Sequence, residues 1–227
     1  MKTIVVIGGS RGIGQSIVKL LLPAHKVISI SRTKSDFEHI NLIQYAVDVL
    51  CEELPEISVV DGLVYCPGSI NLKPISRLKL EDFRNDFEIN VIGAVKTIQQ
   101  YLPVLKRGNK PSIVLFSTVA TTLGMPFHAS VSAAKSAVEG LVKSLGAELA
   151  PTIRINAIAP TVTDTELASK ILRNEKMIDM ITERHPLKKF LNPEEVADMT
   201  EFLVSPRSAS ISGQVFKMDC GIVSFKI

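Results

Sequence analysis

Short, uninterrupted apolar runs recur along this chain, and longer stretches with helical spacing separate most of them. Runs of four to seven apolar residues without alternation are typical of strands buried on both faces of a parallel sheet. The pattern predicts an α/β fold with a doubly wound parallel sheet of about seven strands, in one domain that spans residues 1–227. The expected strands are residues 3–7, 26–30, 59–65, 112–117, 152–158 and 213–217, and the expected helices are residues 12–22, 80–106, 130–150 and 193–204.

Two regions lack a strong helical period. Residues 31–58 should contain two crossovers of the sheet, and we expect short helices or loops there. Residues 164–191 are polar, carry both signs of charge and follow an expected strand. Because ligands of such sheets bind beyond the carboxyl ends of the strands, we expect residues 164–191 to form a mobile helical segment over a cleft.

A glycine-rich turn follows the first expected strand directly and opens the first expected helix. Glycines in such a turn let backbone N–H groups approach a pyrophosphate, and the N-terminus of the helix faces the anion. Because strand, turn and helix follow in the order that this motif requires, the turn predicts a dinucleotide-binding site. It consists of Gly8, Gly9, Ser10, Arg11, Gly12, Ile13 and Gly14.

Further residues and segments that match the pattern of one known family follow this turn along the chain. They are Asp48, residues 65–68 (Tyr-Cys-Pro-Gly), Asn90, Ser117-Thr118, residues 154–160 (Arg-Ile-Asn-Ala-Ile-Ala-Pro), Pro186-Leu187, residues 193–197 and residues 211–221. With them the sequence resembles the short-chain dehydrogenase/reductase family over residues 3–221. The resemblance implies a Rossmann fold, a nicotinamide cofactor, and hydride transfer to or from a small carbonyl or alcohol substrate.

The residues after the second expected strand favour NADP(H) over NAD(H). An acidic residue there would accept hydrogen bonds from the adenosine ribose and repel a 2′-phosphate, whereas arginine favours that phosphate. This chain has Ser31-Arg32-Thr33, and Arg11 of the glycine-rich turn can reach the same phosphate. The alternative is that both arginines are solvated surface residues.

The resemblance also implies which residues contact the cofactor. Asp48 resembles the acid that meets the adenine, Lys135 the lysine that holds the nicotinamide ribose, and Thr165 the threonine that contacts the carboxamide. The complete expected set is Gly8, Gly9, Ser10, Arg11, Gly12, Ile13, Gly14, Ser31, Arg32, Asp48, Cys66, Pro67, Gly68, Asn90, Lys135, Pro160, Thr161, Val162 and Thr165.

The stretch that would carry the family's catalysis departs from the family pattern. In the family a tyrosine transfers the proton, a lysine four residues later lowers the pKa of that tyrosine, and a serine orients the carbonyl. Here Lys135 is present, Val131 stands four residues before it, and Thr118 stands at the serine position. The resemblance implies that Asn90 holds a water of the proton path. Thr161 stands where the family usually has glycine and adds a side chain near the nicotinamide.

His128 is the first candidate for a replacement proton donor. It lies three residues before Val131, and histidine is the side chain best suited to proton transfer near neutral pH. A loop histidine without a role is the alternative. Ser130 and Ser132 flank Val131 but should point about 100° to either side of it on an ideal helix. The expected catalytic set is therefore Asn90, Thr118, Lys135 and His128.

The remaining titratable side chains do not predict a metal site. His25, His39 and His185 lie in segments that we do not expect to reach the cleft. No His, Cys, Asp or Glu cluster has the spacing of metal ligands, so no metal is expected. The three cysteines are an odd number without a C-x-x-C pair, which argues against a disulfide framework and fits a reducing cytoplasm.

Charge and hydropathy exclude two classes of partner. The chain has 26 Lys+Arg against 23 Asp+Glu and no basic run longer than two residues, so we expect no nucleic-acid binding. No 18 apolar residues run together, and the apolar run near the N-terminus is too short for a signal peptide. We therefore expect no membrane-spanning helix and no secretory leader.

Three functions remain open from the sequence. The first is an NADP(H)-dependent oxidoreductase with a degenerate catalytic set, in which His128 or a water replaces the tyrosine. The second is a cofactor-binding sensor or regulatory module without hydride transfer, and the third is non-redox chemistry on the same scaffold. The resemblance implies a homotetramer, with a homodimer as the next expectation, in which helices 80–106 and 130–150 pair across a two-fold axis.

Overall fold

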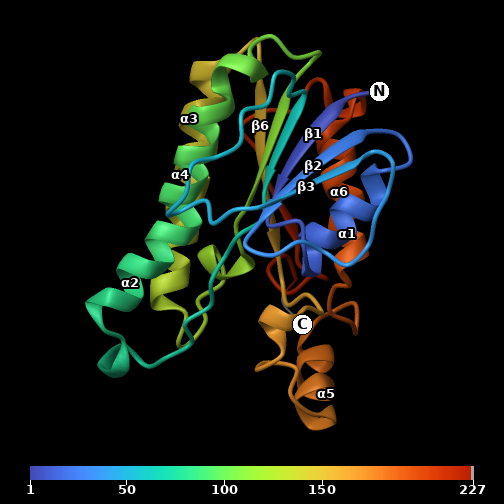
Figure 1. The fold of residues 1–227 in the computed structure, drawn as a ribbon. Coiled ribbons are helices and arrows are strands. Elements are labelled where there is room, and N and C mark those ends of the chain that lie inside the picture. The colour runs from blue at the N-terminus through green and yellow to red at the C-terminus, as the bar shows by residue number, and fades with distance from the viewer. Residues whose placement is uncertain (226–227) are drawn as a thin grey trace.

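Seven parallel strands form one sheet in the order β3-β2-β1-β4-β5-β6-β7 in the computed structural model, which describes residues 1–225 (Figure 1). The strands are β1 (Thr3–Ile7), β2 (Lys26–Ser31), β3 (Leu42–Ala46), β4 (Gly62–Tyr65), β5 (Ser112–Phe116), β6 (Arg154–Pro160) and β7 (Val215–Met218). The predicted doubly wound α/β sheet is thereby confirmed.

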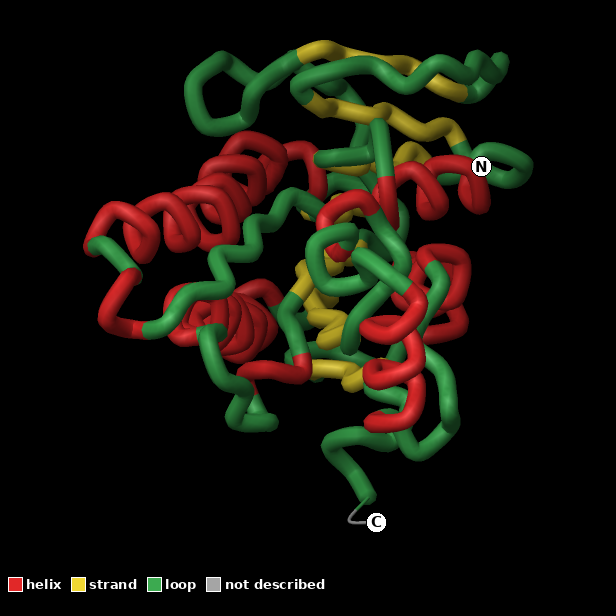
Figure 2. The backbone as a smooth tube through the Cα atoms, turned by 90° about the horizontal axis from the view of Figure 1, so that it is seen from below, coloured by secondary structure: helices red, strands yellow, loops and turns green. Residues whose placement is uncertain are grey.

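Helices cover both faces of this sheet, and Figure 2 shows the strands running between them. The helices are α1 (Gly12–Leu21), α2 (Leu80–Phe87), α3 (Gly93–Leu105), α4 (Ala129–Leu149), α5 (Glu175–Arg184) and α6 (Pro193–Val204). Helix α6 starts where the sequence predicts it, because Pro193 occupies the first turn and Asn192 forms a capping box with Glu195.

Alternation along the strands divides the apolar core into two layers. On β1, Val5 and Ile7 belong to the cluster that includes α3 and α4, whereas Ile4 and Val6 belong to the cluster that includes α1 and α6. Successive side chains of a strand point to opposite faces, so a strand with apolar residues at every position can pack against both helix layers. This explains the uninterrupted apolar runs in the sequence.

The region between β2 and β4 contains no helix, as expected, but it does contain a strand that the apolar runs did not reveal. Strand β3 lies at the edge of the sheet and pairs only with β2. Its side chains are partly or fully exposed, so its sequence includes polar positions such as Gln44. An edge strand of this kind does not need the apolar run by which the buried strands were recognised.

The single helix expected over residues 80–106 is divided in the structure. Helix α2 passes through a π-helical turn, Glu88–Ile92, before α3 begins. Within this turn the side chain of Asn90 donates from Nδ2 to the Asp86 carbonyl at 2.7 Å. A side chain that binds a carbonyl of the preceding turn competes with the regular backbone ladder, so the break coincides with one of the expected site residues.

The chain reverses its direction of winding between β1 and β4, which is where such sheets bind ligands. The turn after β1 and the loop after β4 therefore lie at the same edge of the sheet. Residues 164–191 are partly helical, as expected, with a short 3₁₀ turn at Glu166–Ala168 and then α5. Within residues 1–225, no helix combines the length and apolarity that crossing a membrane requires.

Candidate functional site

The glycine-rich turn connects β1 to α1 with a backbone that other residues would not tolerate. Gly8 and Gly12 have φ values of +77° and +53°. A Cβ atom on Gly14 would lie 2.2 Å from the Gly8 carbonyl oxygen, so only glycine lets α1 pack this close to the turn. Arg11 at the N-cap makes no side-chain capping bond. The first N–H groups of α1 are thus available to an anion.

The arginine of this turn reaches the end of β2. Nη2 of Arg11 lies 3.5 Å from Thr33 Oγ1, and Nη1 forms an exposed ion pair with Glu166 at 3.0 Å. The Ser31 hydroxyl is buried and has no hydrogen-bond partner within residues 1–225. The side chain of Arg32 makes no ion pair within the same range. The structure therefore brings Arg11 to the Ser31-Arg32-Thr33 segment, as the sequence predicted.

A central cavity of about 180 Å³ lies between the turn, the loop after β4 and helix α4. We define it by its lining residues, which are Ile13, Cys66, Gly68, Ser69, Ile70, Phe116, Ser117, Thr118, Val119, Met125, His128, Val131, Lys135, Pro160, Thr161, Val162, Thr163, Thr165, Leu167, Ala168 and Ile171. Of the four expected catalytic residues, Thr118, His128 and Lys135 line this cavity.

The loop after β4 forms one wall of the central cavity. A Cβ atom on Gly8 would lie 3.2 Å from Pro67 Cδ, so this loop packs against the glycine-rich turn. Burial raises the pKa of the Cys66 thiol to about 12, against the lowering effect of Lys135. Cys66 is therefore a neutral wall residue rather than a nucleophile. Asp48 lies further along the same edge, where its Oδ1 accepts from the Leu50 N–H at 3.0 Å.

Helix α4 presents Lys135 and Val131 to the central cavity from successive turns. Lys135 is 8% exposed, and its Nζ donates to the Phe116 carbonyl at 2.8 Å. Burial lowers the pKa of Lys135 to about 8, while Cys66 and Asp86 act in the opposite direction. Val131 is 5% exposed, so an isopropyl group occupies the position one turn before the lysine, and it cannot exchange a proton.

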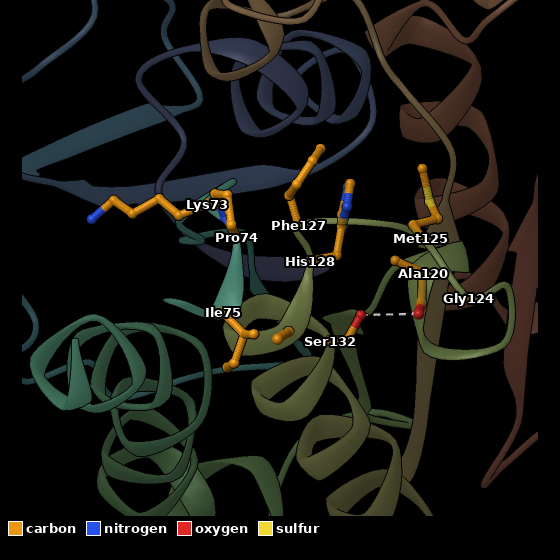
Figure 3. Close-up of a pocket in the computed structure, with 10 residues that line it drawn as sticks. Lys73, Pro74, Ile75, Ala120, Gly124, Met125, Phe127, His128 and Ser132 are labelled. Atoms are coloured by element: carbon orange, nitrogen blue, oxygen red, sulfur yellow. Dashed lines mark hydrogen bonds between the residues drawn. The ribbon is translucent and has the colours of Figure 1, made fainter. Parts of the chain in front are cut away.

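Hydroxyl groups near Val131 are directed to different partners. Thr118 lines the central cavity and accepts a hydrogen bond from the Ala120 N–H at 3.3 Å, which leaves its own proton available. Ser132 donates to the Ala120 carbonyl at 2.9 Å, as Figure 3 shows. Ser130 is buried outside the cavity lining. Thr118 is thus the hydroxyl of this group that faces the cavity.

His128 stands at the N-cap of α4, one residue before the helix begins. Its Nδ1 lies 2.7 Å from the Pro126 carbonyl. Because a carbonyl only accepts, Nδ1 carries a hydrogen and Nε2 is left for another partner. His128 also lines an outer groove of about 550 Å³, drawn in Figure 3. The outer groove is lined by Lys73, Pro74, Ile75, Ala120, Gly124, Met125, Phe127, His128, Ala129 and Ser132.

Asn90 lies behind the cavity wall rather than in it. Besides its bond to the Asp86 carbonyl, its Nδ2 lies 3.2 Å from Ser69 Oγ. Asn90 Oδ1 has no hydrogen-bond partner within residues 1–225. A Cβ atom on Gly68 would lie 3.3 Å from this oxygen and 3.5 Å from Lys135 Nζ. Both atoms therefore lie close to Gly68.

His185 lies against the site, contrary to the expectation that its segment would not reach the cleft. It is 2% exposed, and its Nε2 lies 2.7 Å from the hydroxyl of Thr161, a lining residue of the central cavity. Its Nδ1 lies 2.7 Å from the Ile181 carbonyl and must donate to it, so in the neutral ring Nε2 accepts from Thr161. The fold brings the end of β6 and the end of α5 together here, and no local pattern in the chain indicates this contact.

The β6 end supplies the remaining expected cofactor residues. Pro160, Thr161, Val162 and Thr165 all line the central cavity. Thr165 also lies beside the glycine-rich turn, since a Cβ atom on Gly12 would be 3.4 Å from its Cγ2. Within residues 1–225, no three His, Cys, Asp or Glu side chains are grouped closely enough to hold a metal ion.

Sequence reasoning missed one buried acid. Asp86 is 0% exposed and accepts hydrogen bonds at Oδ1 from Ser69 at 2.5 Å and Asn71 at 2.8 Å. The available signal was its spacing, since Asp86 precedes Asn90 by four residues and therefore lies on the same helix face.

Sequence comparison connects the chain to known reductases. A family model described as Enoyl-(Acyl carrier protein) reductase matches residues 34–223. Carbonyl reductase (NADPH) 2 of Sus scrofa is 29% identical, over 96% of this chain and 95% of its own length. Acetoacetyl-CoA reductase of Synechocystis sp. is 30% identical, over 96% of this chain and 95% of its own length.

Solved structures share the same architecture. The ligand-free aldohexose dehydrogenase of Thermoplasma acidophilum superposes with a TM-score of 0.90 at 27% identity, covering 99% of this chain and 95% of that chain. A variant of ElxO with NADPH bound superposes with a TM-score of 0.88 at 28% identity, covering 99% of this chain and 100% of that chain. By sequence, fold and cavity position, the chain belongs to the short-chain dehydrogenase/reductase family.

Proposed function

We propose that this chain is an NADP(H)-dependent oxidoreductase that acts on a small carbonyl or alcohol substrate with a non-standard proton donor. The observation that carries the proposal is the central cavity, which both Thr118 and Lys135 line beside the glycine-rich turn. Two matched relatives are named carbonyl reductase and acetoacetyl-CoA reductase, which supports carbonyl reduction here.

The residues at the adenosine end fit a cofactor with a 2′-phosphate. Arg11 already reaches Thr33, Arg32 is adjacent, and the buried Ser31 hydroxyl has an unused hydrogen bond. Charge-assisted hydrogen bonds from guanidinium groups favour a phosphate over a ribose hydroxyl. The exposed ion pair of Arg11 with Glu166 is weak competition for such a bond. The Sus scrofa relative is named an NADPH carbonyl reductase, and the ElxO variant has NADPH bound.

Five residues of the central cavity have a role in this proposal. Bound nicotinamide supplies or accepts the hydride. Lys135 holds the nicotinamide ribose, while Thr161 and Thr165 form the wall at its carboxamide end. Thr118 donates a hydrogen bond from its hydroxyl to the substrate oxygen and so orients the carbonyl. His128, whose Nε2 is not engaged by Pro126, or a water at the same wall, transfers the proton in place of the tyrosine.

Val131 favours a second candidate function, a cofactor-binding sensor or regulatory module. An isopropyl group cannot supply a proton, and loss of a general acid typically costs about 10²–10⁴ in rate. The cofactor-side residues do not depend on Val131, so binding would persist without turnover. In that case the bound dinucleotide would report redox state to a partner.

Two measurements separate these candidates. The first is direct NADPH affinity, and the second is single-turnover NADPH oxidation with a panel of carbonyl and enone compounds. The oxidoreductase proposal expects micromolar-range or tighter binding, as is common for enzyme ligands, together with oxidation by at least one carbonyl class. Tight binding without oxidation by any compound would favour the module, and absence of binding would contradict both.

We also propose a homotetramer, or failing that a homodimer, in the cytoplasm. The α4 face that includes Ala133, Gly140 and Ser144 is exposed in the single chain, and small residues there let a second α4 approach closely. Free thiols at Cys51, Cys66 and Cys220 are compatible with a reducing compartment. Sedimentation equilibrium tests the assembly, and a monomer at micromolar concentration would contradict it.

A further inference from the structure

Asp86 is a buried carboxylate that the proposed mechanism does not use. It is 0% exposed and lies near the end of α2. Its Oδ1 accepts from Ser69 and Asn71, whereas its Oδ2 has no hydrogen-bond partner within residues 1–225. None of the ion pairs found in that range includes Asp86. A buried charge without direct compensation is costly, so a nearby opposite charge is expected.

The cation toward which this arrangement leads is Lys135. Side-chain contacts run from Asp86 toward the lysine: Ser69 donates to Asp86 at 2.5 Å, and Asn90 Nδ2 donates to Ser69 Oγ at 3.2 Å. Asn90 Oδ1 and Lys135 Nζ then both face Gly68. The carboxylate of Asp86 also acts on Lys135 through space and raises its pKa against the effect of burial.

Lys135 has few other charged neighbours. Burial is the main influence on it, and the groups that oppose burial are Cys66 at the end of β4 and Asp86 on α2. Burial keeps the Cys66 thiol neutral below about pH 12. Glu139, one turn further along α4, is hydrogen-bonded to Ser117 at 2.5 Å and Thr121 at 2.7 Å. At neutral pH, Asp86 is therefore the group left to compensate a charge on Lys135.

We propose that Asp86 is a positioning residue of this site, whose buried carboxylate is the counter-charge that keeps Lys135 an ammonium at neutral pH. The inference rests on the proposed function for its consequence, because a charged Lys135 donates stronger hydrogen bonds to the ribose hydroxyls than a neutral amine does and attracts the negative charge that develops on a reduced carbonyl. With Val131 in place of a phenol, Lys135 is the charged group that remains beside the substrate oxygen.

The first test measures the titration of Lys135 in the cofactor-free protein. Competitive acetylation with acetic anhydride between pH 6 and 10, read at Lys135 by mass spectrometry, gives the midpoint for wild type, Asp86→Asn and Asp82→Asn. Asp82 is the matched control, since it lies on the same helix but is bonded to Lys73. We expect Asp86→Asn to lower the midpoint by about one pH unit or more, and Asp82→Asn to leave it unchanged. An unchanged midpoint in Asp86→Asn would overturn the proposal.

The second test measures NADPH affinity against pH for the same three proteins. Asp86→Asn should bind like wild type at pH 6 and several-fold more weakly at pH 8, because its lysine is neutral at the higher pH. An equal loss at both pH values would mean that Asp86 only maintains the fold and would overturn the proposal. If wild type binds no NADPH, the proposed function fails while the acetylation test still decides the role of Asp86.

A third comparison covers the case in which Asp86→Asn alone does not fold. Lys135→Met leaves the Asp86 carboxylate buried without its counter-charge, so adding Asp86→Asn should raise the urea midpoint of the Lys135→Met protein at pH 8. Removing both members of a buried charge pair is less costly than removing one. A double variant with a lower urea midpoint than Lys135→Met would contradict the pairing.

Discussion

Introducing a phenol at position 131 tests whether the central cavity retains the geometry for carbonyl reduction. Val131 and Lys135 present their side chains to this cavity from successive turns of α4, and the Thr118 hydroxyl faces the same space. The cavity volume of about 180 Å³ is several times the share of one water in the liquid, about 30 Å³. Val131→Tyr should therefore place its ring in the cavity without displacing the core.

The expected gain follows from the proton that the phenol supplies. A positioned general acid contributes about 10²–10⁴ in rate, equivalent to about 3–5 kcal/mol of transition-state stabilisation. Lys135 should depress the pKa of the phenol while it is charged. Since the pKa of Lys135 is about 8, the gained activity should be largest below pH 8 and decline above it.

The assay is NADPH consumption with a panel of ketones and diketones at several pH values. Wild type, Val131→Tyr, Val131→Phe and Val131→Tyr with Thr118→Ser are compared. Val131→Phe is the matched control, because it adds the same ring without the hydroxyl. The reasoning is refuted if Val131→Tyr and Val131→Phe are equally active. It is refuted equally if wild type is already fast and the tyrosine slows it, which would make His128 the leading donor.

Four further predictions concern the cofactor, Lys135 and the Thr161–His185 contact. Arg32→Asp with Arg11→Ala should weaken NADPH binding at least tenfold and leave NADH binding unchanged or improved, since each lost charge-assisted bond contributes about 1.5–3 kcal/mol; equal losses in titrations with both cofactors would contradict the 2′-phosphate assignment. Lys135→Met should lower NADPH affinity at matched ionic strength, and an unchanged affinity would remove Lys135 from the site. Folding lowers the pKa of Lys135 from 10.5 to about 8, so between these pH values the unfolded chain binds more protons than the folded protein. The free energy of unfolding of wild type should therefore rise relative to that of Lys135→Met as pH increases from 8 to 10.5. The expected rise in urea unfolding is about 3 kcal/mol at most. Thr161→Val should cost about 1–3 kcal/mol in the same assay, because it leaves Nε2 of the buried His185 without its donor; an unaltered urea midpoint would speak against that bond.

Much of the cofactor half of the site could be predicted from local sequence. The turn from Gly8 to Gly14 depends on positive φ angles and on a close approach of α1 to the turn that only glycine permits. Consecutive residues are therefore enough to predict this turn. The start of α6 is equally local, because Asn192, Pro193 and Glu195 complete one capping motif. Strands that are buried on both faces can be recognised by their unbroken apolar runs.

Other features depend on pairings between distant segments and could not be read from the chain. Strand β3 is defined by its hydrogen bonds to β2 and not by its own pattern. His185 becomes part of the site because the end of α5 packs against Thr161 at the end of β6. The expected helix over residues 130–150 already left His128 before the helix, but only the fold showed that His128 lines both the central cavity and the outer groove.

The sequence by itself determined the buried strands, the glycine-rich turn and the presence of apolar Val131 four residues before Lys135, because each depends on residues adjacent in the chain or one helical turn apart. Only the tertiary structure decided the electrostatics of the site. Lys135 comes from α4, Asp86 from α2 and Cys66 from the end of β4, and burial lowers the pKa of Lys135 and raises that of Cys66. The pKa of a buried group depends on which segments pack around it and on which charges they bring near. Local sequence patterns do not show how three separate segments pack together.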